Sequence, residues 1–338
     1  MTTETLPPPP RETANPAPQR QADSVRRTCS IDVSWPDGPE SDRLFIGRAR
    51  DLLTPKSGGA GTVIGEASMR ATMKEDKTIA SISADPAPPN LGALVGQRAG
   101  GHLRVVLHEK MPELIEQAAP LYLPLDDLSG TALVSAFAWS QWYPDWANKI
   151  RERFSDAEFE KLMTNRIDIC WGLAEGNSGV QPGGPPNSVA DADAGDLRNP
   201  ADPEGWHMLS DNEGPGFRRA RRIDVTRDPA TGHLIVDSSF QDSARQKDGG
   251  RVAIHEYNLG AVVDPDTLQI MKLEPEARIL PFPECPGAVH NTQRLVGASI
   301  SDIREEVLMH LRGTHGCTHL NDALRALAEV PMLARHLA

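Results

Sequence analysis

The feature that most constrains the fold of this chain is an internal repeat. Residues 26–33 read RRTCSIDV, and residues 218–225 read RRARRIDV. Each segment leads through a glycine-containing turn and an apolar strand to an aspartate, which is Asp51 in the first copy and Asp242 in the second. Self-similarity of this kind is the sequence signature of repeated structural units. Any fold proposed for the chain therefore has to place two related units.

The match continues in the same order through the rest of both copies. The further aligned segments are residues 63–73 with 253–263, 94–96 with 295–297, and 123–128 with 318–323. The gaps between them are similar in the two halves. The sequence therefore predicts a duplication, with a first, degenerate copy at residues 25–138 and a second copy at residues 218–338.

Hydrophobic periodicity predicts strands followed by helices within each copy. Residues 252–263 alternate and contain Ile, Tyr, Leu and Val, which is typical of a strand. Ile303 and Val307 fall on one helical face, and a second apolar stripe over residues 320–330 is expected to end at Pro331. We therefore expect an α+β fold in which each copy is an antiparallel sheet followed by two helices, with the two copies packed as a pseudo-dimer.

The remaining segments have the composition of a tail, an insertion and a linker. Residues 1–24 are rich in Pro, Thr, Gln and Ala and predict a disordered tail. Residues 139–217 have no duplicate, and their part from 175 to 203 is rich in Gly, Pro, Asp and Asn, which indicates a long loop. This insertion holds five of the six tryptophans, namely Trp139, Trp142, Trp146, Trp171 and Trp206. The rings are interpreted either as core or as the lining of a pocket for an apolar ligand.

Charge and hydropathy disfavour several classes of protein. The formal net charge is −12, whereas nucleic-acid binding requires a positive surface. No apolar run approaches the roughly 20 residues that span a bilayer, and residues 1–24 lack the apolar segment of a signal peptide. We therefore expect a cytoplasmic protein in a reducing compartment, without nucleic-acid or membrane partners. The four cysteines (Cys29, Cys170, Cys285 and Cys317) are then expected to be free or metal-bound rather than disulfide-paired.

A group of Cys and His residues in the second copy predicts a metal site. Cys317 and His319 stand two residues apart in Gly-Cys-Thr-His, at the glycine-rich entry to the last predicted helix. Thiolate and imidazole are the usual ligands of zinc, and a helix N-terminus favours the thiolate. Cys285 in Pro-Phe-Pro-Glu-Cys-Pro and His255 on a predicted strand complete a set of two thiols and two imidazoles. This set predicts a divalent metal, with zinc as the expected ion and iron as an alternative.

The first copy lacks all of these candidate ligands. The positions aligned with His255, Cys317 and His319 hold Gly65, Tyr122 and Pro124, respectively. The candidate ligands disappear together while the surrounding motifs persist, which indicates a site in the second copy alone. The simpler interpretation is that these are ordinary buried Cys and His residues, which are common in protein cores.

The motifs of the second copy resemble those of the bacterial domain-of-unknown-function family 2889. The matching residues are Asp237 or Asp242 after the first strands, His255, Pro-Phe-Pro-Glu-Cys at 281–285, Leu-Val-Gly at 295–297, and Gly-Cys-Thr-His-Leu at 316–320. The resemblance implies no defined activity, although it places the chain among proteins of bacteria that degrade aromatic compounds. A looser likeness to iron–sulfur cluster scaffold proteins implies that His255, Cys285 and Cys317 converge on one point.

Three functions are compatible with these residues. The first is a metal-dependent enzyme, a hydrolase or lyase acting on an apolar or aromatic small molecule, in which the ion polarises the substrate or activates water. Glu256 would then serve as general acid or base, and Asp322 would orient His319. Asp127, which aligns with Asp322, persists in the copy without ligands, so a structural role for Asp322 is equally consistent. The alternatives are a non-catalytic binding or accessory protein with a structural zinc and a metal or iron–sulfur handling protein. The sequence leaves the oligomeric state open.

Overall fold

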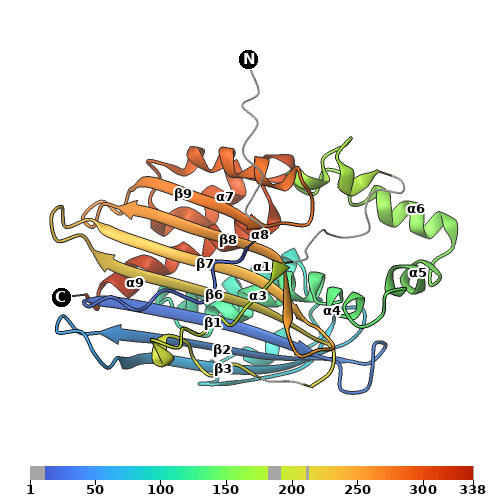
Figure 1. Ribbon diagram of the computed structural model, residues 1–338, viewed down its shortest axis with the longest axis horizontal. Coiled ribbons are helices and arrows are strands. Elements are labelled where there is room, and N and C mark those ends of the chain that lie inside the picture. Colours follow the sequence, from blue (N-terminus) through green and yellow to red (C-terminus); the bar gives the residue numbers. More distant parts are fainter. Residues whose placement is uncertain (1–11, 182–191, 211–212, 338) are drawn as a thin grey trace, which may run out of the picture.

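One antiparallel β-sheet forms the centre of the molecule (Figure 1). The computed structural model describes residues 12–181, 192–210 and 213–337. In this part of the chain the strands are β1 (Ser24–Ser34), β2 (Arg43–Thr54), β3 (Thr62–Met73), β4 (Ile79–Asp85), β5 (Ala192–Asp193), β6 (Gly216–Arg227), β7 (Leu234–Arg245), β8 (Arg251–Val263) and β9 (Ile270–Ile279). They follow the order β4-β3-β2-β1-β6-β7-β8, and both β5 and β9 pair with β8. Two meanders, β1–β4 and β6–β9, are thus joined where β1 pairs with β6.

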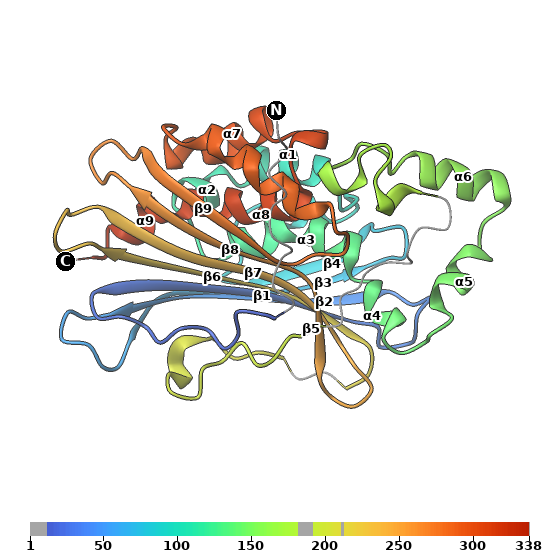
Figure 2. The ribbon, with the colours of Figure 1, turned by 45° about the horizontal axis from the view of Figure 1, so that its top comes forward.

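Helices cover one face of this sheet (Figures 1 and 2). After the first meander come α1 (Gly101–Lys110), α2 (Pro112–Glu116) and α3 (Tyr122–Val134), and after the second come α7 (Ile303–His310), α8 (Thr318–Arg325) and α9 (Val330–Ala334). Between them, α4 (Phe137–Ser140) packs against the sheet, and α5 (Trp146–Arg151) and α6 (Asp156–Thr164) form an arm that extends past the ends of the strands. The expected mixture of helices with a large antiparallel sheet is confirmed. No helix among the described residues has the length and apolar character needed to cross a membrane.

Two local expectations differ from the structure. Pro331 is expected to end a helix, but it stands in the first turn of α9, where a backbone N–H has no partner to lose. The stretch from residue 12 to residue 23 is expected to be disordered, but it runs along the sheet. Ala17 is buried, and its N–H donates to Leu197 O at 3.1 Å. Residues 1–11 of the predicted tail and residues 182–191 of the predicted loop lie outside the described residues.

The tryptophans of the insertion take separate positions. The Trp139 ring packs against Trp35 with centroids 5.4 Å apart and against Trp146 with centroids 5.6 Å apart. Trp139 is buried and belongs to the core under the first meander. Trp206 is also buried, in a small apolar cluster with Ala17 and Leu197. Part of the tryptophan set is therefore core, as the simpler interpretation expects.

Buried arginines on the two central strands are each bound to a carboxylate. Arg27 on β1 donates to both oxygens of Asp51, at 2.6 and 2.5 Å. Arg219 on β6 donates to both oxygens of Asp242, at 2.8 and 2.9 Å. The side chains of the two arginines are 2% and 1% exposed. Because an unpaired buried charge costs several kcal/mol, each guanidinium needs its carboxylate for the fold to be stable.

The seam between β1 and β6 is reciprocal in register. Arg26 lies opposite Asp224, and Asp32 lies opposite Arg218. Both pairs are ion pairs, at 2.6 Å for Arg26 Nε with Asp224 Oδ1 and at 2.7 Å for Arg218 Nε with Asp32 Oδ1. An arginine–aspartate pair thus joins the two strands toward each end of the seam. The arginine comes from β1 in one pair and from β6 in the other.

The buried pair of Arg221 and Asp127 offers a test of this arrangement. Arg221 donates to the two oxygens of Asp127 at 2.6 Å each, and the side chains are 4% and 2% exposed. Arg221→Met leaves Asp127 without its cation, and we expect the free energy of unfolding in urea to fall by about 3–5 kcal/mol. In the control Arg198→Met, the half-exposed pair with Asp196 is lost, and a change below about 1 kcal/mol is expected. Equal losses in the two variants would contradict the assignment.

A buried histidine gives the sheet a pH-dependent stability. His207 lies 2.8 Å from the hydroxyls of both Ser30 and Thr28, and burial lowers the pKa of His207 to about 3. An unfolded histidine has a pKa of about 6.5, so between pH 6.5 and 3 the unfolded state binds more protons. Stability is therefore expected to fall with falling pH in this window, by up to about 1.4 kcal/mol per unit from this residue. Urea unfolding at pH 7, 6, 5 and 4 should show a shallower slope for His207→Gln, and an unchanged slope would count against the prediction.

Candidate metal site

Three ionisable side chains meet between the sheet and α8. Asp242 on β7 and His255 on β8 lie opposite each other in the antiparallel register. His319 stands in the first turn of α8. One potential ligand atom from each residue lies within 4.8 Å of the other two. The side chains are 0%, 6% and 14% exposed in that order, so His319 provides the more accessible side of the group.

The Oδ2 atom of Asp242 is the point on which the two imidazoles converge. It lies 3.2 Å from His255 Nδ1 and 3.8 Å from His319 Nε2. The imidazole rings stack with centroids 3.5 Å apart and planes inclined by 18°. In a tetrahedral site with bonds of about 2.1 Å, two ligand atoms are about 3.4 Å apart. The two distances lie on either side of this value, whereas the stacked rings direct their in-plane lone pairs nearly parallel, so binding of one ion would require an imidazole to turn.

Arg219 fixes the carboxylate of this group. Its bidentate pair with Asp242 orients both oxygens, and its guanidinium lies over the Phe240 ring at 4.9 Å from the centroid. Burial by itself would raise the pKa of Asp242, but the Arg219 guanidinium and the hydrogen bond from His255 hold it well below its usual range. The carboxylate is therefore ionised and available as a ligand.

Both imidazoles are kept neutral by their surroundings. Burial lowers the pKa of His255, against the opposing influence of Asp242. Burial also lowers the pKa of His319 well below its usual range, and the neighbouring His255 acts in the same direction. A neutral imidazole has the free lone pair that metal binding requires.

The two cysteines predicted as ligands lie in a neighbouring group rather than in this one. Within the described residues, no cysteine sulfur joins Asp242, His255 and His319 in a common ligand group. Cys317 is the N-cap of α8 and lies beside the hydroxyl of Tyr257. The backbone of Cys317 is extended, with φ −121° and ψ 131°, whereas His319 lies within the helix. The two side chains therefore leave the chain from different backbone conformations, and the two-residue spacing does not direct them to one point.

A third thiol, Cys170, completes this neighbouring group. Cys317 raises the pKa of both Cys170 and Cys285 after the larger effect of burial, so the three sulfurs are electrostatic neighbours. Cys170 precedes the short helix η2 (Trp171–Leu173), and Cys285 begins the helix η5 (Cys285–Leu295). A Cβ on Gly172 would collide with Cys285 Sγ, so glycine is what allows this approach.

Comparison with known proteins finds one family match, over the part of the chain that contains Asp242, His255 and His319. Residues 217–333 match the family described as "Protein of unknown function (DUF2889)". The resemblance seen in the sequence motifs is thereby confirmed for this DUF2889 region. No curated protein and no solved structure matches the chain.

The DUF2889 region contains Asp242, His255, His319, Cys285 and Cys317, whereas Cys170 comes from the insertion. The metal ligands predicted from the sequence do not include Asp242 or Cys170. Asp242 could have been predicted, since it ends a repeated segment and belongs to the family motif. Cys170 could not, because nothing in its neighbouring sequence indicates a ligand.

Glu256 of the DUF2889 region lies away from this group. Successive residues of a strand point to opposite faces of the sheet, so Glu256 and its neighbour His255 are directed apart. The Glu256 carboxylate accepts hydrogen bonds from Gln241 Nε2 at 2.7 Å and from Ala14 N at 2.6 Å. The general acid or base expected from the sequence is therefore separated from the His255 side by the thickness of the sheet.

Asp322 reaches the group through an arginine. It accepts from Arg104 Nη2 at 2.6 Å and from Arg219 Nη1 at 3.3 Å. Burial would raise the pKa of Asp322, but Arg104, Arg219 and Arg221 hold it well below its usual range. Asp322 thus positions Arg219, which in turn positions Asp242, and its side chain is hydrogen-bonded to these arginines rather than to His319.

Proposed function

We propose that this protein is a metal-dependent enzyme, a hydrolase or a lyase, whose divalent ion is held by Asp242, His255 and His319. The observation that carries the proposal is the convergence of an ionised carboxylate and two neutral imidazoles within 4.8 Å. Three protein ligands leave a position open for water or substrate, as catalytic sites require. Zinc is the expected ion, and iron is the alternative because two histidines and one carboxylate also form the ligand set of non-haem iron enzymes.

The residues around the three ligands support a catalytic role. A bound ion would supply Lewis acidity and would lower the pKa of a bound water. Arg219 and Asp322 hold the carboxylate in one orientation, which keeps the ligand geometry fixed. Phe240 is 1% exposed, and its ring, whose centroid is 6.2 Å from that of His319, packs beside this imidazole in the core. The substrate that we propose is an apolar or aromatic small molecule.

We further propose that the two meanders are copies of one unit packed as a pseudo-dimer. Asp51 lies opposite Gly65 as Asp242 lies opposite His255, and the pairing register shifts directly after each aspartate. These matching positions support the alignment of the two copies. A Cβ at Gly65 would lie 3.0 Å from Pro120 Cγ, so the first unit has little room for a ligand side chain at this position. The proposed active site is therefore confined to the second unit.

The thiol group supports a second candidate function. Cys170, Cys285 and Cys317 come from three separate segments and influence one another's pKa, and soft thiolates select zinc, copper(I) or iron–sulfur clusters. Their sulfurs do not all lie within 4.8 Å of one another, so a shared ion would have to draw them closer. An ion held there would tie the insertion to the DUF2889 region. The protein would then be a non-catalytic binding or accessory protein with a structural zinc, or a metal or iron–sulfur handling protein.

Elemental analysis of purified variants separates these two proposals. Protein prepared without chelators is expected to contain about one zinc or iron per chain, as a mononuclear site requires. His319→Ala should lose this metal, because it removes one of three ligands, whereas Cys285→Ser should retain it. The control His315→Ala removes an exposed histidine four positions earlier and should also retain it. Circular dichroism of each variant establishes that the fold is kept.

The opposite pattern of metal retention would place the metal site at the cysteines. Loss of metal in Cys285→Ser together with retention in His319→Ala would contradict the enzyme proposal and support the thiol site. Absence of metal from every variant, in anaerobic preparations as well, would contradict both. If the first pattern holds, a screen with aromatic esters and hydroxylated aromatic acids should detect turnover by the native protein and none by His319→Ala.

A further inference from the structure

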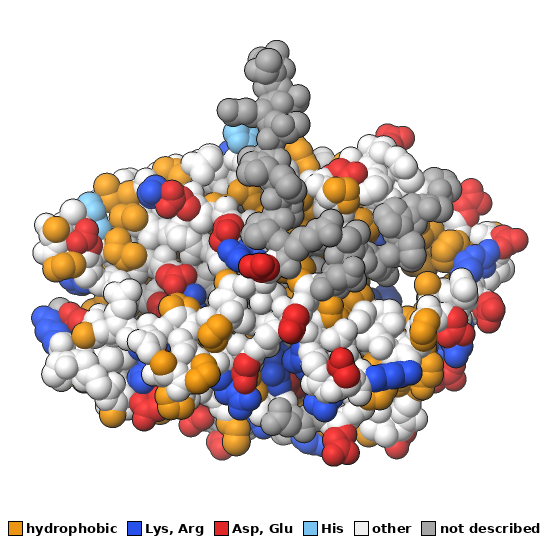
Figure 3. Space-filling model, in the orientation of Figure 1, with side chains coloured by type: hydrophobic (Ala, Val, Ile, Leu, Met, Phe, Trp, Pro, Cys, Tyr) orange, Lys and Arg blue, Asp and Glu red, His pale blue; other side chains and the backbone are white. Residues whose placement is uncertain are grey.

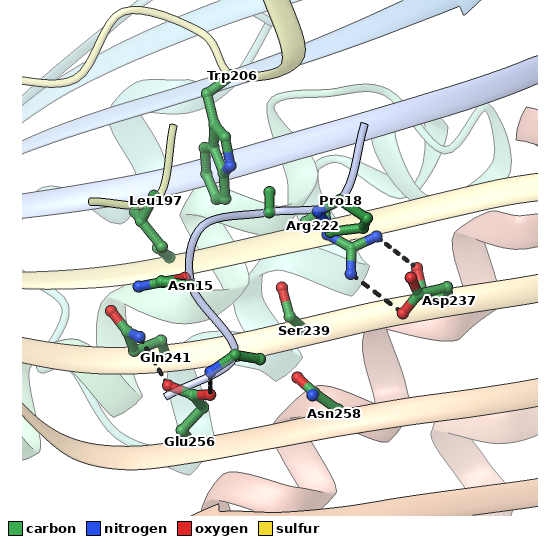
Figure 4. Close-up of a pocket in the computed structure, with 13 residues that line it drawn as sticks. Asn15, Pro18, Leu197, Trp206, Arg222, Asp237, Ser239, Gln241, Glu256 and Asn258 are labelled. Carbon is green, nitrogen blue, oxygen red and sulfur yellow. Dashed lines mark hydrogen bonds and ion pairs between the residues drawn. The ribbon is translucent and has the colours of Figure 1, made fainter. Parts of the chain in front are cut away.

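A cavity lies on the face of the sheet that is turned away from the helices. It has a volume of about 140 Å³, and its floor is formed by side chains of β6, β7 and β8 (Figure 4). Ser239, Gln241 and Glu256 of this floor each directly adjoin, along their strands, a residue that faces the helices, such as Phe240, Asp242 or His255. The cavity is therefore separated from the proposed metal site by the sheet.

The cavity contains buried polar atoms that have no partner in the part of the chain that the structure describes. These atoms are Trp206 Nε1, Arg222 Nε and Asn258 Oδ1. Trp206 is 4% exposed and Arg222 is 3% exposed, so both side chains are almost fully buried. Leaving a buried polar atom unpaired costs about 1–3 kcal/mol, and native proteins contain few such atoms. A bound molecule with acceptors for the two N–H groups and a donor for Asn258 would satisfy all three.

Other walls of the cavity come from the start of the described chain. Ala14, Asn15, Ala17 and Pro18 line the cavity, and Figure 4 shows Asn15 and Pro18 over the strands. Ala14 N donates to the Glu256 carboxylate. Arg20 fastens the end of this segment through an ion pair of 2.8 Å with Asp202. Trp206 and Leu197 enclose the cavity from another side. The site is thus built from segments that are distant in sequence, each with its own anchor.

The charges that line the cavity select the kind of ligand. Arg222 is already neutralised by Asp237 at 3.0 Å and by Asp224. Glu256 is 3.5 Å from Arg278 Nε, and burial raises the pKa of the Glu256 carboxyl. Among the described residues that line the cavity, Arg222 is the cation, and its ion pairs leave no positive charge to hold an anion. The Trp206 ring supplies an apolar wall. Acidic and basic side chains are also interspersed on the surface of this face (Figure 3), so it does not attract one sign of charge.

We propose that this cavity is a binding site for a small, neutral, ring-sized compound that carries both hydrogen-bond donors and acceptors, such as a cyclic amide or a phenol. A cavity of about 150 Å³ holds one benzene ring in another protein, which sets the size of the ligand. The Trp206 indole N–H and Arg222 Nε donate to acceptors of the ligand, which lies at the edge of the indole ring. Asn258 and Glu256 accept from the ligand. The inference is independent of the metal site.

Binding of matched probes tests the proposal. Uracil, nicotinamide and phenol represent the neutral class, and benzoate, benzamidine and benzene represent anionic, cationic and purely apolar ligands. Titration calorimetry of the full chain should detect the neutral probes with dissociation constants below about 1 mM, a value that ring-sized ligands can reach. Ser239→Leu fills the cavity and is expected to weaken their binding at least tenfold. Its control is Ser83→Leu on β4, where the same change falls on an exposed position of the other meander.

Two further variants keep the proposal falsifiable. If Ser239→Leu does not fold, Asn258→Ala removes the acceptor and should produce the same loss of affinity. His319→Ala should leave probe binding unchanged, which distinguishes this cavity from the metal site. Binding that is lost in His319→Ala but kept in Ser239→Leu would overturn the assignment, as would binding of benzoate alone. Failure of every probe to bind would show a cavity that holds water only.

Discussion

The buried bidentate pair between Arg219 and Asp242 is the interaction on which both the sheet and the proposed site depend. It joins β6 to β7 in the interior, at a place where neither charge can be left alone. The same pair sets the position of the carboxylate oxygen that faces His255 and His319. Asp322 and Arg104 extend the pair into the helical layer. Fold stability and site geometry therefore share one set of atoms, and a change to Arg219 would affect both.

Hydrophobic periodicity predicted the mixture of antiparallel strands and helices, because an apolar period of two residues indicates a strand and one of about 3.6 residues indicates a helix. The alignment of Asp51 and Gly65 with Asp242 and His255 agrees with the strand pairing, since a register error of one residue would turn every side chain to the other face. Residues 12–23 could not be placed in this way. Their order comes from partners such as Asp202 and Leu197, which lie far along the chain and leave no local pattern.

Two of the three residues of the candidate site could also be predicted from the sequence. His255 and His319 could be brought together from the motifs and the repeat, and the structure places them in contact. Cys317 could not be separated from His319 by spacing alone, because the direction of a side chain at a helix start depends on where the helix begins. Glu256 was assigned to the reaction from its position beside His255, although adjacent strand residues face opposite sides. Chain neighbours on a strand are thus poor evidence for a shared site.

The seam between β1 and β6 has a consequence for how the protein is made. Its paired residues are close to 200 positions apart, as with Arg26 and Asp224, so β1 emerges from the ribosome long before its partner. Until then the first meander presents an open edge whose charged groups have no counterpart, and such edges favour association with other chains. Contacts at this sequence distance also form slowly. This protein would therefore depend most on a chaperone during synthesis, after β1 has emerged from the ribosome and before β6 has done so.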